Sequence, residues 1–206
     1  MAELGPLPSG GEEGATVWLT GLPSAGKSTL ARAVAERLGE SRRVEVLDGD
    51  EMRARLFPEL GFDRRDREAN VRRIGYVAQL LASNGVLVLA PVISPFAADR
   101  AKVREQHAST GVAFLEVHVA TPVEVCSRRD VKGLYARNAA GGLSGLTGVD
   151  APYEPPAVPD LRLDTAGSSI TESAEEICRL LAARGFATGD AADTLNGADM
   201  MEVLDV

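Results

Sequence analysis

The chain has 206 residues, 45% of them hydrophobic and 25% charged, which is typical of one globular domain and too short for two large ones. Its formal net charge of −8 argues against general nucleic-acid binding, so an anionic ligand would need a local basic site. The apolar runs are shorter than a membrane span, the first residues lack signal-peptide character, and there are only two cysteines. We therefore expect a cytoplasmic protein with no membrane and no nucleic-acid partner.

Three regions are expected along the chain. Residues 1–14 are rich in Gly, Pro and Glu and predict a mobile arm. Residues 15–187 alternate strand-like and helix-like segments, which predicts an α/β domain, and residues 188–206 form an acidic tail. Within the domain, residues 130–159 are rich in Gly, Ala and Pro and are too long for an idle connection, so they predict a lid.

The first strand and helix of the domain flank a phosphate-binding motif. Residues 16–20 are apolar and β-branched, as in a buried strand, and the apolar residues after the motif are spaced four apart, as on one helix face. Between them, residues 21–29 match G-x-x-x-x-G-K-[ST]. Such a loop surrounds phosphate with backbone N–H groups, Lys27 adds a positive charge, and Ser28 would place a hydroxyl on Mg²⁺. The motif predicts a nucleoside-triphosphate site.

The remaining elements continue the alternation of strand and helix. Strands are predicted at residues 44–47, 86–90, 113–119 and 161–163. Helices are predicted up to residue 56 and at residues 67–83, 97–107, 122–129 and 173–184. This order predicts a parallel sheet flanked by helices, with the functional residues at the carboxyl ends of the strands.

Two carboxylates follow the second predicted strand. Asp48 and Asp50 flank a glycine and should project at the same sheet edge as the phosphate loop. Asp-Gly-Asp also forms simple turns, but phosphoryl transfer needs a metal, an oriented nucleophile and a proton acceptor, and such a pair can divide those tasks. We favour the chemical role because of the phosphate loop.

Charged and planar side chains come next in the sequence. Arg53 lies one helical turn beyond the carboxylates, Arg67 and Asn70 share a helix face, and Phe62 is on a loop. Together they predict a pocket for an anionic second substrate with a planar ring.

From residue 15 to residue 185 the chain resembles the adenylylsulfate (APS) kinase family. The stretches that carry the resemblance, in the family's order, are residues 21–29, 47–50 with Arg53, 60–62, 66–73, 93–96, 99–100, 116–117, 121–126, 132–135, 147–150 and 152–154. A phosphate loop alone would indicate only a large superfamily, and this series is far more specific. The resemblance implies a three-layer P-loop kinase fold. It also implies phosphorylation of the 3′-hydroxyl of adenosine 5′-phosphosulfate (APS) by ATP and Mg²⁺ in sulfate assimilation.

The resemblance also implies roles on the ATP side of the site. The loop residues that would bind ATP are Gly21, Ser24, Ala25, Gly26, Lys27, Ser28 and Thr29. Ser28 and Asp48 belong to the metal side and Asp50 would be the catalytic base, although the reverse assignment of the two carboxylates stays open. Arg128 or its neighbour Arg129 would stack on the ATP adenine.

On the acceptor side, the resemblance assigns Arg53, Arg67 and Asn70 to the phosphosulfate and ribose and places Phe62 against the adenine. Three more residues complete this half of the site: Ile93 and Ser94 in the wall of the acceptor pocket, and Lys132 at the transferring phosphoryl group. The family's serine at position 94 has been described as phosphorylatable, and we prefer a role in shaping the pocket.

The chain departs from the family at Leu146, where an aromatic residue would complete a two-sided clamp on the acceptor adenine with Phe62. The departure leaves open a kinase for another nucleotide-like or phosphorylated acceptor. A non-catalytic NTP-binding switch is a further alternative, although the chain contains no N-K-x-D guanine-reading motif. The resemblance also suggests a homodimer and a functional link to ATP sulfurylase.

Overall fold

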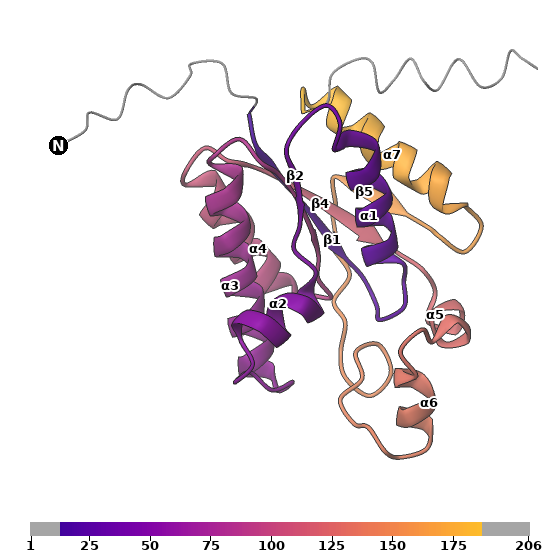
Figure 1. Ribbon diagram of the computed structural model, residues 1–206. Coiled ribbons are helices and arrows are strands. Elements are labelled where there is room, and N and C mark those ends of the chain that lie inside the picture. The colour runs from indigo at the N-terminus through magenta and orange to yellow at the C-terminus, as the bar shows by residue number, and fades with distance from the viewer. Residues whose placement is uncertain (1–12, 187–206) are drawn as a thin grey trace, which may run out of the picture.

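The computed structural model describes residues 13–186, which fold around a central parallel sheet (Figure 1). Its strands are β1 (Ala15–Thr20), β2 (Val44–Val46), β3 (Leu87–Pro91), β4 (Ala113–Val119) and β5 (Leu161–Leu163). They lie in the order β2-β3-β1-β4-β5, and every neighbouring pair is parallel. The expected parallel α/β sheet is confirmed, and β1 is its central strand.

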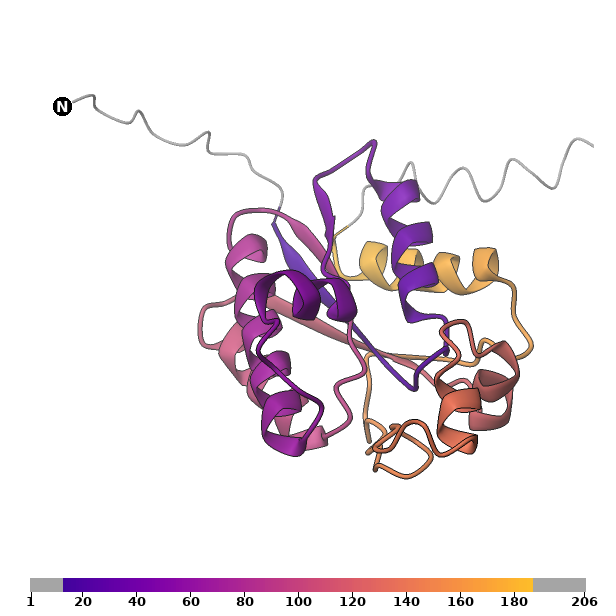
Figure 2. The same cartoon turned by 60° about the horizontal axis from the view of Figure 1, so that its bottom comes forward.

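Helices cover both faces of this sheet. In the described part of the chain they are α1 (Lys27–Leu38), α2 (Gly49–Leu56), α3 (Arg64–Ala82), α4 (Ala97–Ala108), α5 (Val123–Arg129), α6 (Leu134–Ala139) and α7 (Ile170–Ala183). Helices α1 and α7 pack on one face, and α3 and α4 pack on the other, so the fold has the three layers that the sequence predicts (Figures 1 and 2).

The core is divided between the two faces of β1. Successive side chains of a strand point to opposite sides, so Val17 and Leu19 pack with the α1 and α7 layer, whereas Trp18 packs with the α3 and α4 layer. Every residue of β1 is buried, which explains why its sequence contains only apolar residues and threonine and no exposed charged face.

Two helices begin one turn earlier than their apolar pattern predicts, because polar caps start them. At α3 the Asp63 side chain accepts a hydrogen bond from the Asp66 N–H. At α7 Ser169 and Glu172 form a capping box, in which each side chain bonds the other residue's backbone.

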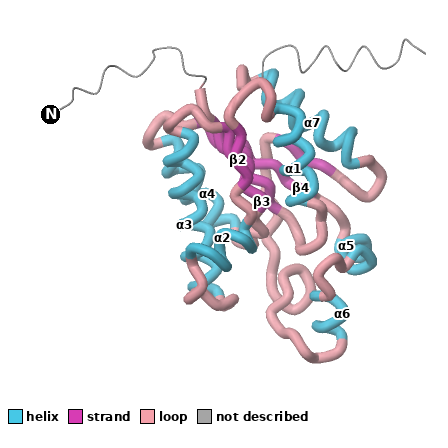
Figure 3. Tube along the Cα trace, viewed as in Figure 1, coloured by secondary structure: helices cyan, strands magenta, loops and turns pink. Residues whose placement is uncertain are grey.

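The segment between α5 and β5 lies at one end of the sheet and is mostly loop (Figure 3). It contains the short helix α6, which the sequence does not predict. None of the described helices is long and apolar enough to cross a membrane. The expected arm lies outside the described residues except for its last two, and the acidic tail lies outside them entirely.

Candidate active site

The carboxyl ends of β1, β2 and β3 face a cavity of about 860 Å³, at the end of the molecule that Figure 2 turns toward the viewer. Its wall combines the phosphate loop, the start of α2, the first half of α3, the loop after β3 and part of the segment after α5. A cavity of this size at the strand ends of a parallel sheet is a usual ligand site. The phosphate loop, the two carboxylates and the arginines therefore lie around one cavity, as the sequence predicts.

The phosphate loop turns tightly between β1 and α1. Gly21 has φ 155°, and a Cβ at this position would lie 2.5 Å from the Val119 carbonyl oxygen, so only glycine fits. Gly26, with φ 101°, immediately precedes α1. Ser24, Gly26, Lys27, Ser28 and Thr29 line the cavity. Ala25 lies behind the wall, and its carbonyl accepts hydrogen bonds from two threonine side chains.

Lys27 is buried at the base of this loop. Its ammonium donates to the carbonyls of Gly21 (3.0 Å) and Leu22 (2.7 Å). Burial lowers its pKa to about 8, although the nearby Asp50 carboxylate acts in the opposite direction. The loop therefore holds a poorly solvated cation, which an anionic ligand would stabilise.

The first carboxylate, Asp48, is the N-cap of α2 and faces the phosphate loop. It accepts hydrogen bonds from the Ser28 hydroxyl (2.5 Å) and from the Asp50 backbone N–H (3.0 Å). Burial acts to raise the pKa of Asp48, but the hydrogen bonds outweigh it and the pKa is lowered. Asp48 is thus held as a carboxylate beside a hydroxyl, an oxygen pair of the type that Mg²⁺ prefers.

The second carboxylate, Asp50, is exposed on the first turn of α2 and forms an ion pair with Lys132, which comes from the lid segment. Both residues line the cavity. Lys132, from the segment predicted to be a lid, therefore contacts Asp50 in the same cavity as the phosphate loop.

The second half of the cavity concentrates positive charge. Arg53 donates to the Gly61 carbonyl (2.5 Å), and its guanidinium lies 4.7 Å from the centre of the Phe62 ring, which is 68% exposed. Arg67 donates to the Thr147 hydroxyl and to the Gly145 carbonyl, both at 2.7 Å. Burial and the neighbouring Arg67 lower the pKa of Arg53, as expected where two cations share a site.

Asn70 also lines this half, and it is only 5% exposed. Its Oδ1 is buried and forms no hydrogen bond with the described residues. A buried amide oxygen without a partner is rare and costly, so this atom is well suited to accept a hydrogen bond from a ligand.

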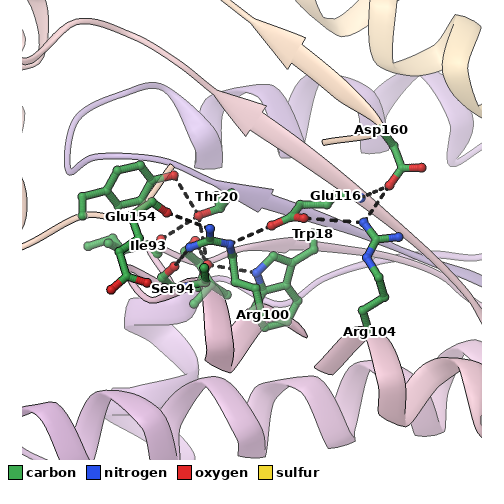
Figure 4. A network of polar contacts seen from close by, with 12 residues as sticks. Trp18, Thr20, Ile93, Ser94, Arg100, Arg104, Glu116, Glu154 and Asp160 are labelled. Carbon is green, nitrogen blue, oxygen red and sulfur yellow. Dashed lines mark hydrogen bonds and ion pairs between the residues drawn. The ribbon is translucent and has the colours of Figure 1, made fainter. Parts of the chain in front are cut away.

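Ile93 and Ser94 lie in the loop after β3 and line the cavity as expected. Ser94 is 1% exposed, and its hydroxyl is held between the Trp18 ring nitrogen and the Thr20 hydroxyl, each at 3.0 Å (Figure 4). A phosphoryl group on this oxygen would have to displace both partners. The geometry favours the pocket-shaping role over phosphorylation.

Leu146 lines the cavity but is only 5% exposed, and it packs into the main apolar core. Whether it completes a clamp with Phe62 stays a prediction. Of the two arginines considered for the ATP adenine, Arg129 lines the cavity and donates to the Thr165 carbonyl (2.6 Å). Arg128 is not among the described residues on the cavity wall, so the position of Arg129 suits this role better.

Several contacts that organise the cavity are not predictable from the motifs. The Tyr135 hydroxyl, on α6, donates to the Pro23 carbonyl (3.0 Å), which joins the lid to the phosphate loop. Arg67 joins the lid to α3 through the two bonds given above. The signal in the sequence was that Tyr135 ends one of the stretches that carry the family resemblance, residues 132–135, in the segment predicted to be a lid.

These features define a class: the chain is a P-loop kinase of small molecules, with a phosphate loop and an acceptor pocket opening on one cavity. Comparison with known proteins gives the family. Residues 13–164 match the family model described as adenylylsulphate kinase, and the chain belongs to that family. The family and the fold that the sequence predicts are thereby confirmed.

Individual proteins with related names are similar to this chain over most of its length. The adenylyl-sulfate kinase of Synechococcus sp. (strain JA-3-3Ab) is 49% identical over 177 residues, 85% of this chain and 98% of that protein. The bifunctional enzyme CysN/CysC of Mycobacterium tuberculosis is 50% identical over 169 residues, which are 82% of this chain and 27% of that protein. The structure of the M. tuberculosis APS kinase CysC with AMPPNP and APS has a TM-score of 0.80 and 48% identity, covering 83% of this chain and 99% of that one.

Proposed function

We propose that this protein transfers the γ-phosphoryl group of ATP to the 3′-hydroxyl of APS and so makes 3′-phosphoadenylylsulfate in sulfate assimilation. One observation carries the proposal: the phosphate loop and the arginine-lined acceptor hollow open on one cavity, with Asp48 and Asp50 beside the loop. Membership of the adenylylsulphate kinase family and the likeness to an APS kinase with a bound ATP analogue and APS support it.

On the ATP side, the backbone N–H groups of residues 21–29 surround the phosphates and Lys27 supplies the charge. Arg129 lies against the nucleotide base. Ser28 and Asp48 would hold Mg²⁺, because the hydroxyl and the carboxylate form a hard-oxygen pair 2.5 Å apart. When bound, Mg²⁺ neutralises charge on the β- and γ-phosphates.

On the acceptor side, Arg53 and Arg67 bind the phosphosulfate and Phe62 stacks on the adenine. The Oδ1 of Asn70, which has no hydrogen-bond partner among the described residues, accepts a hydrogen bond from the ribose. Ile93 and Ser94 form the wall behind them.

Asp50 accepts the proton of the 3′-hydroxyl as that oxygen attacks phosphorus. Its ion pair with Lys132 keeps the lid lysine at the point where the phosphoryl group passes. A compact ammonium can follow the moving charge from the leaving oxygen to the acceptor, whereas a planar guanidinium prefers a fixed bidentate geometry.

The test is phosphoryl transfer from radiolabelled ATP with APS, with other nucleotides, or with no acceptor. We expect transfer to APS alone. Transfer to a different acceptor would indicate a kinase of the same fold with another substrate, and hydrolysis without an acceptor would indicate a switch.

Replacing Phe62 by Ala is expected to raise the KM for APS about five- to tenfold, because an offset-stacked aromatic face is lost. The kcat and the KM for ATP should change little, and so should stability, since the ring is 68% exposed. Initial rates at varied APS measure the effect. Tyr76→Ala is the matched control, because this α3 residue is 59% exposed and lies outside the main cavity. Equal KM values for APS in the Phe62 variant and the wild type would contradict the stacking role.

The assembly and location are also part of the proposal. We expect a homodimer, as the family resemblance suggests. We also expect a functional link to ATP sulfurylase, and the bifunctional relative, which joins a segment like this one to a longer chain, is consistent with such a link. We propose a cytoplasmic location, which agrees with the charge and cysteine content of the sequence.

A further inference from the structure

The loop that forms one wall of the acceptor pocket contains a strained residue. Ser94 has φ 39°, a left-handed conformation that residues other than glycine rarely adopt. Such a conformation persists only where the surrounding structure holds it. Ser94 and its neighbours Ile93 and Pro95 all line the cavity, so whatever holds Ser94 also sets the shape of this wall.

Arg100, on α4, donates a hydrogen bond to the Ser94 backbone (Figure 4). Its Nη1 donates to the Ser94 carbonyl at 2.7 Å. Its other two nitrogens are equally engaged: Nε donates to Glu116 on β4, and Nη2 donates to the Glu154 carbonyl, each at 2.7 Å. The side chain is 3% exposed. One guanidinium therefore fixes the sheet, the pocket loop and the chain segment that returns from the lid in a single geometry.

Glu154 reinforces the connection between the lid and the pocket loop. Its backbone N–H donates to the Pro95 carbonyl, and its carboxylate accepts from the Ala97 backbone N–H, both at 2.7 Å. Next to it, the Tyr153 hydroxyl lies 3.1 Å from the Thr20 hydroxyl, which donates to the Ile93 carbonyl. The far end of the lid is thus joined to the pocket loop at several points, and Arg100 is buried among them.

We propose that Arg100 is a positioning residue for the acceptor: it keeps Ser94 in its left-handed conformation and fastens the return of the lid, so that the acceptor pocket is formed before APS arrives. Arg100 is not among the described residues that line the cavity, so it acts through the wall and not by contact. The inference rests on the proposed function, because the pocket is assigned to APS.

Arg104 provides a matched control one helical turn further along α4. It pairs with the same Glu116 carboxylate at 3.5 Å and with Asp160 at 2.9 Å, as Figure 4 shows. Its other recorded contacts are with Phe114, and none joins it to Ser94 or Glu154 among the described residues. Substitution of either arginine disturbs the same ion network, but only Arg100 touches the pocket loop.

The experiment compares Arg100→Lys with Arg104→Lys. Lysine keeps the charge beside Glu116 but cannot reach three acceptors in a fixed fork. We expect Arg100→Lys to raise the KM for APS about tenfold or more while the KM for ATP changes less than about twofold. Arg104→Lys should leave both values near those of the wild type.

A double-mutant cycle separates positioning from simple loss of stability. Glycine adopts positive φ without strain, so the Arg100→Lys change should raise the KM for APS less in a Ser94→Gly background than in the wild type. A second pair, Arg100→Gln with Glu116→Gln, removes both buried charges together and so avoids leaving one unpaired. It should show the same selective loss for APS.

Equal increases of the two KM values, the same effect from Arg104→Lys, or strict additivity with Ser94→Gly would overturn the inference. Absence of APS phosphorylation by the wild-type protein would instead overturn the proposed function, and the positioning role with it. The two failures are therefore distinguishable from the wild-type assay alone.

Discussion

Replacing Asp50 by Asn is expected to lower kcat by about two orders of magnitude or more while leaving ATP binding nearly unchanged. Loss of a general base typically costs about 10²–10⁴ in rate. The side chain is exposed at the first turn of α2, and Asn is nearly isosteric, so the change should not disturb the fold. Steady-state kinetics with APS give kcat, and calorimetric titration with ATP gives the affinity.

A second variant and a control test which of the two carboxylates is the base and which belongs to the metal site. Asp48→Asn should mainly raise the Mg²⁺ concentration needed for half-maximal rate, because Asp48 faces the Ser28 hydroxyl. Asn is a good N-cap, so α2 should survive this change. Glu51→Gln, an exposed neighbour paired with Arg55, should have little effect on either quantity. If Asp50→Asn retains full turnover and Asp48→Asn does not, the two roles are reversed.

Most of the strands and helices are predictable because the spacing of apolar residues in a long segment indicates whether it forms a strand or a helix. Residues 113–119 form β4 with the bounds that the pattern predicts, and β1 is recognisable from its run of apolar residues and threonine. The errors lie where polar caps, and not apolar spacing, decide the first turn, as at Ser169 and Asp63. Helix α6 is too short to show periodicity, so its six residues could not be distinguished from loop.

The sequence predicts which residues form the candidate site better than it predicts which of them contact one another. The motifs name residues that the sheet brings to one edge, since parallel strands end together. They do not say that Arg67 reaches across to Thr147 or that Arg100 reaches Ser94, because these contacts join segments 80 and 6 residues apart through side-chain geometry alone. The choice between Arg128 and Arg129 likewise depends on which side of one short helix faces the cavity.

The segment that the sequence predicts to be a lid, residues 130–159, contacts both halves of the candidate site. Its first part reaches the phosphate loop through Tyr135, its middle reaches α3 through Arg67, and its return is fastened to the pocket loop at Glu154. Lys132 stands near the start of this segment and pairs with Asp50. The lysine is thus carried by a segment that contacts the phosphate loop, α3 and the neighbourhood of the pocket loop, which suits the role proposed for it at the transferring phosphoryl group.

Replacing Lys132 by Ala is accordingly expected to lower kcat about a hundredfold or more while raising the KM for APS only a fewfold. An ammonium that stabilises charge in the transition state and not in the bound substrate affects turnover and kcat/KM together. Lys132→Arg should recover only part of the rate, because the guanidinium is larger and planar. Rates at saturating ATP with varied APS separate the two parameters.

Lys102→Ala is the matched control for this change, because Lys102 forms the same kind of exposed lysine–carboxylate pair, with Glu68, outside the cavity. Exposed pairs contribute little to stability, so neither variant should unfold, and a loss of rate in the Lys132 variant alone would locate the effect in the site. A large rise in the KM for APS with unchanged kcat would instead make Lys132 a substrate-binding residue. In that case Lys27, which is buried beneath the loop, would be the lysine that stabilises charge on the transferring phosphoryl group.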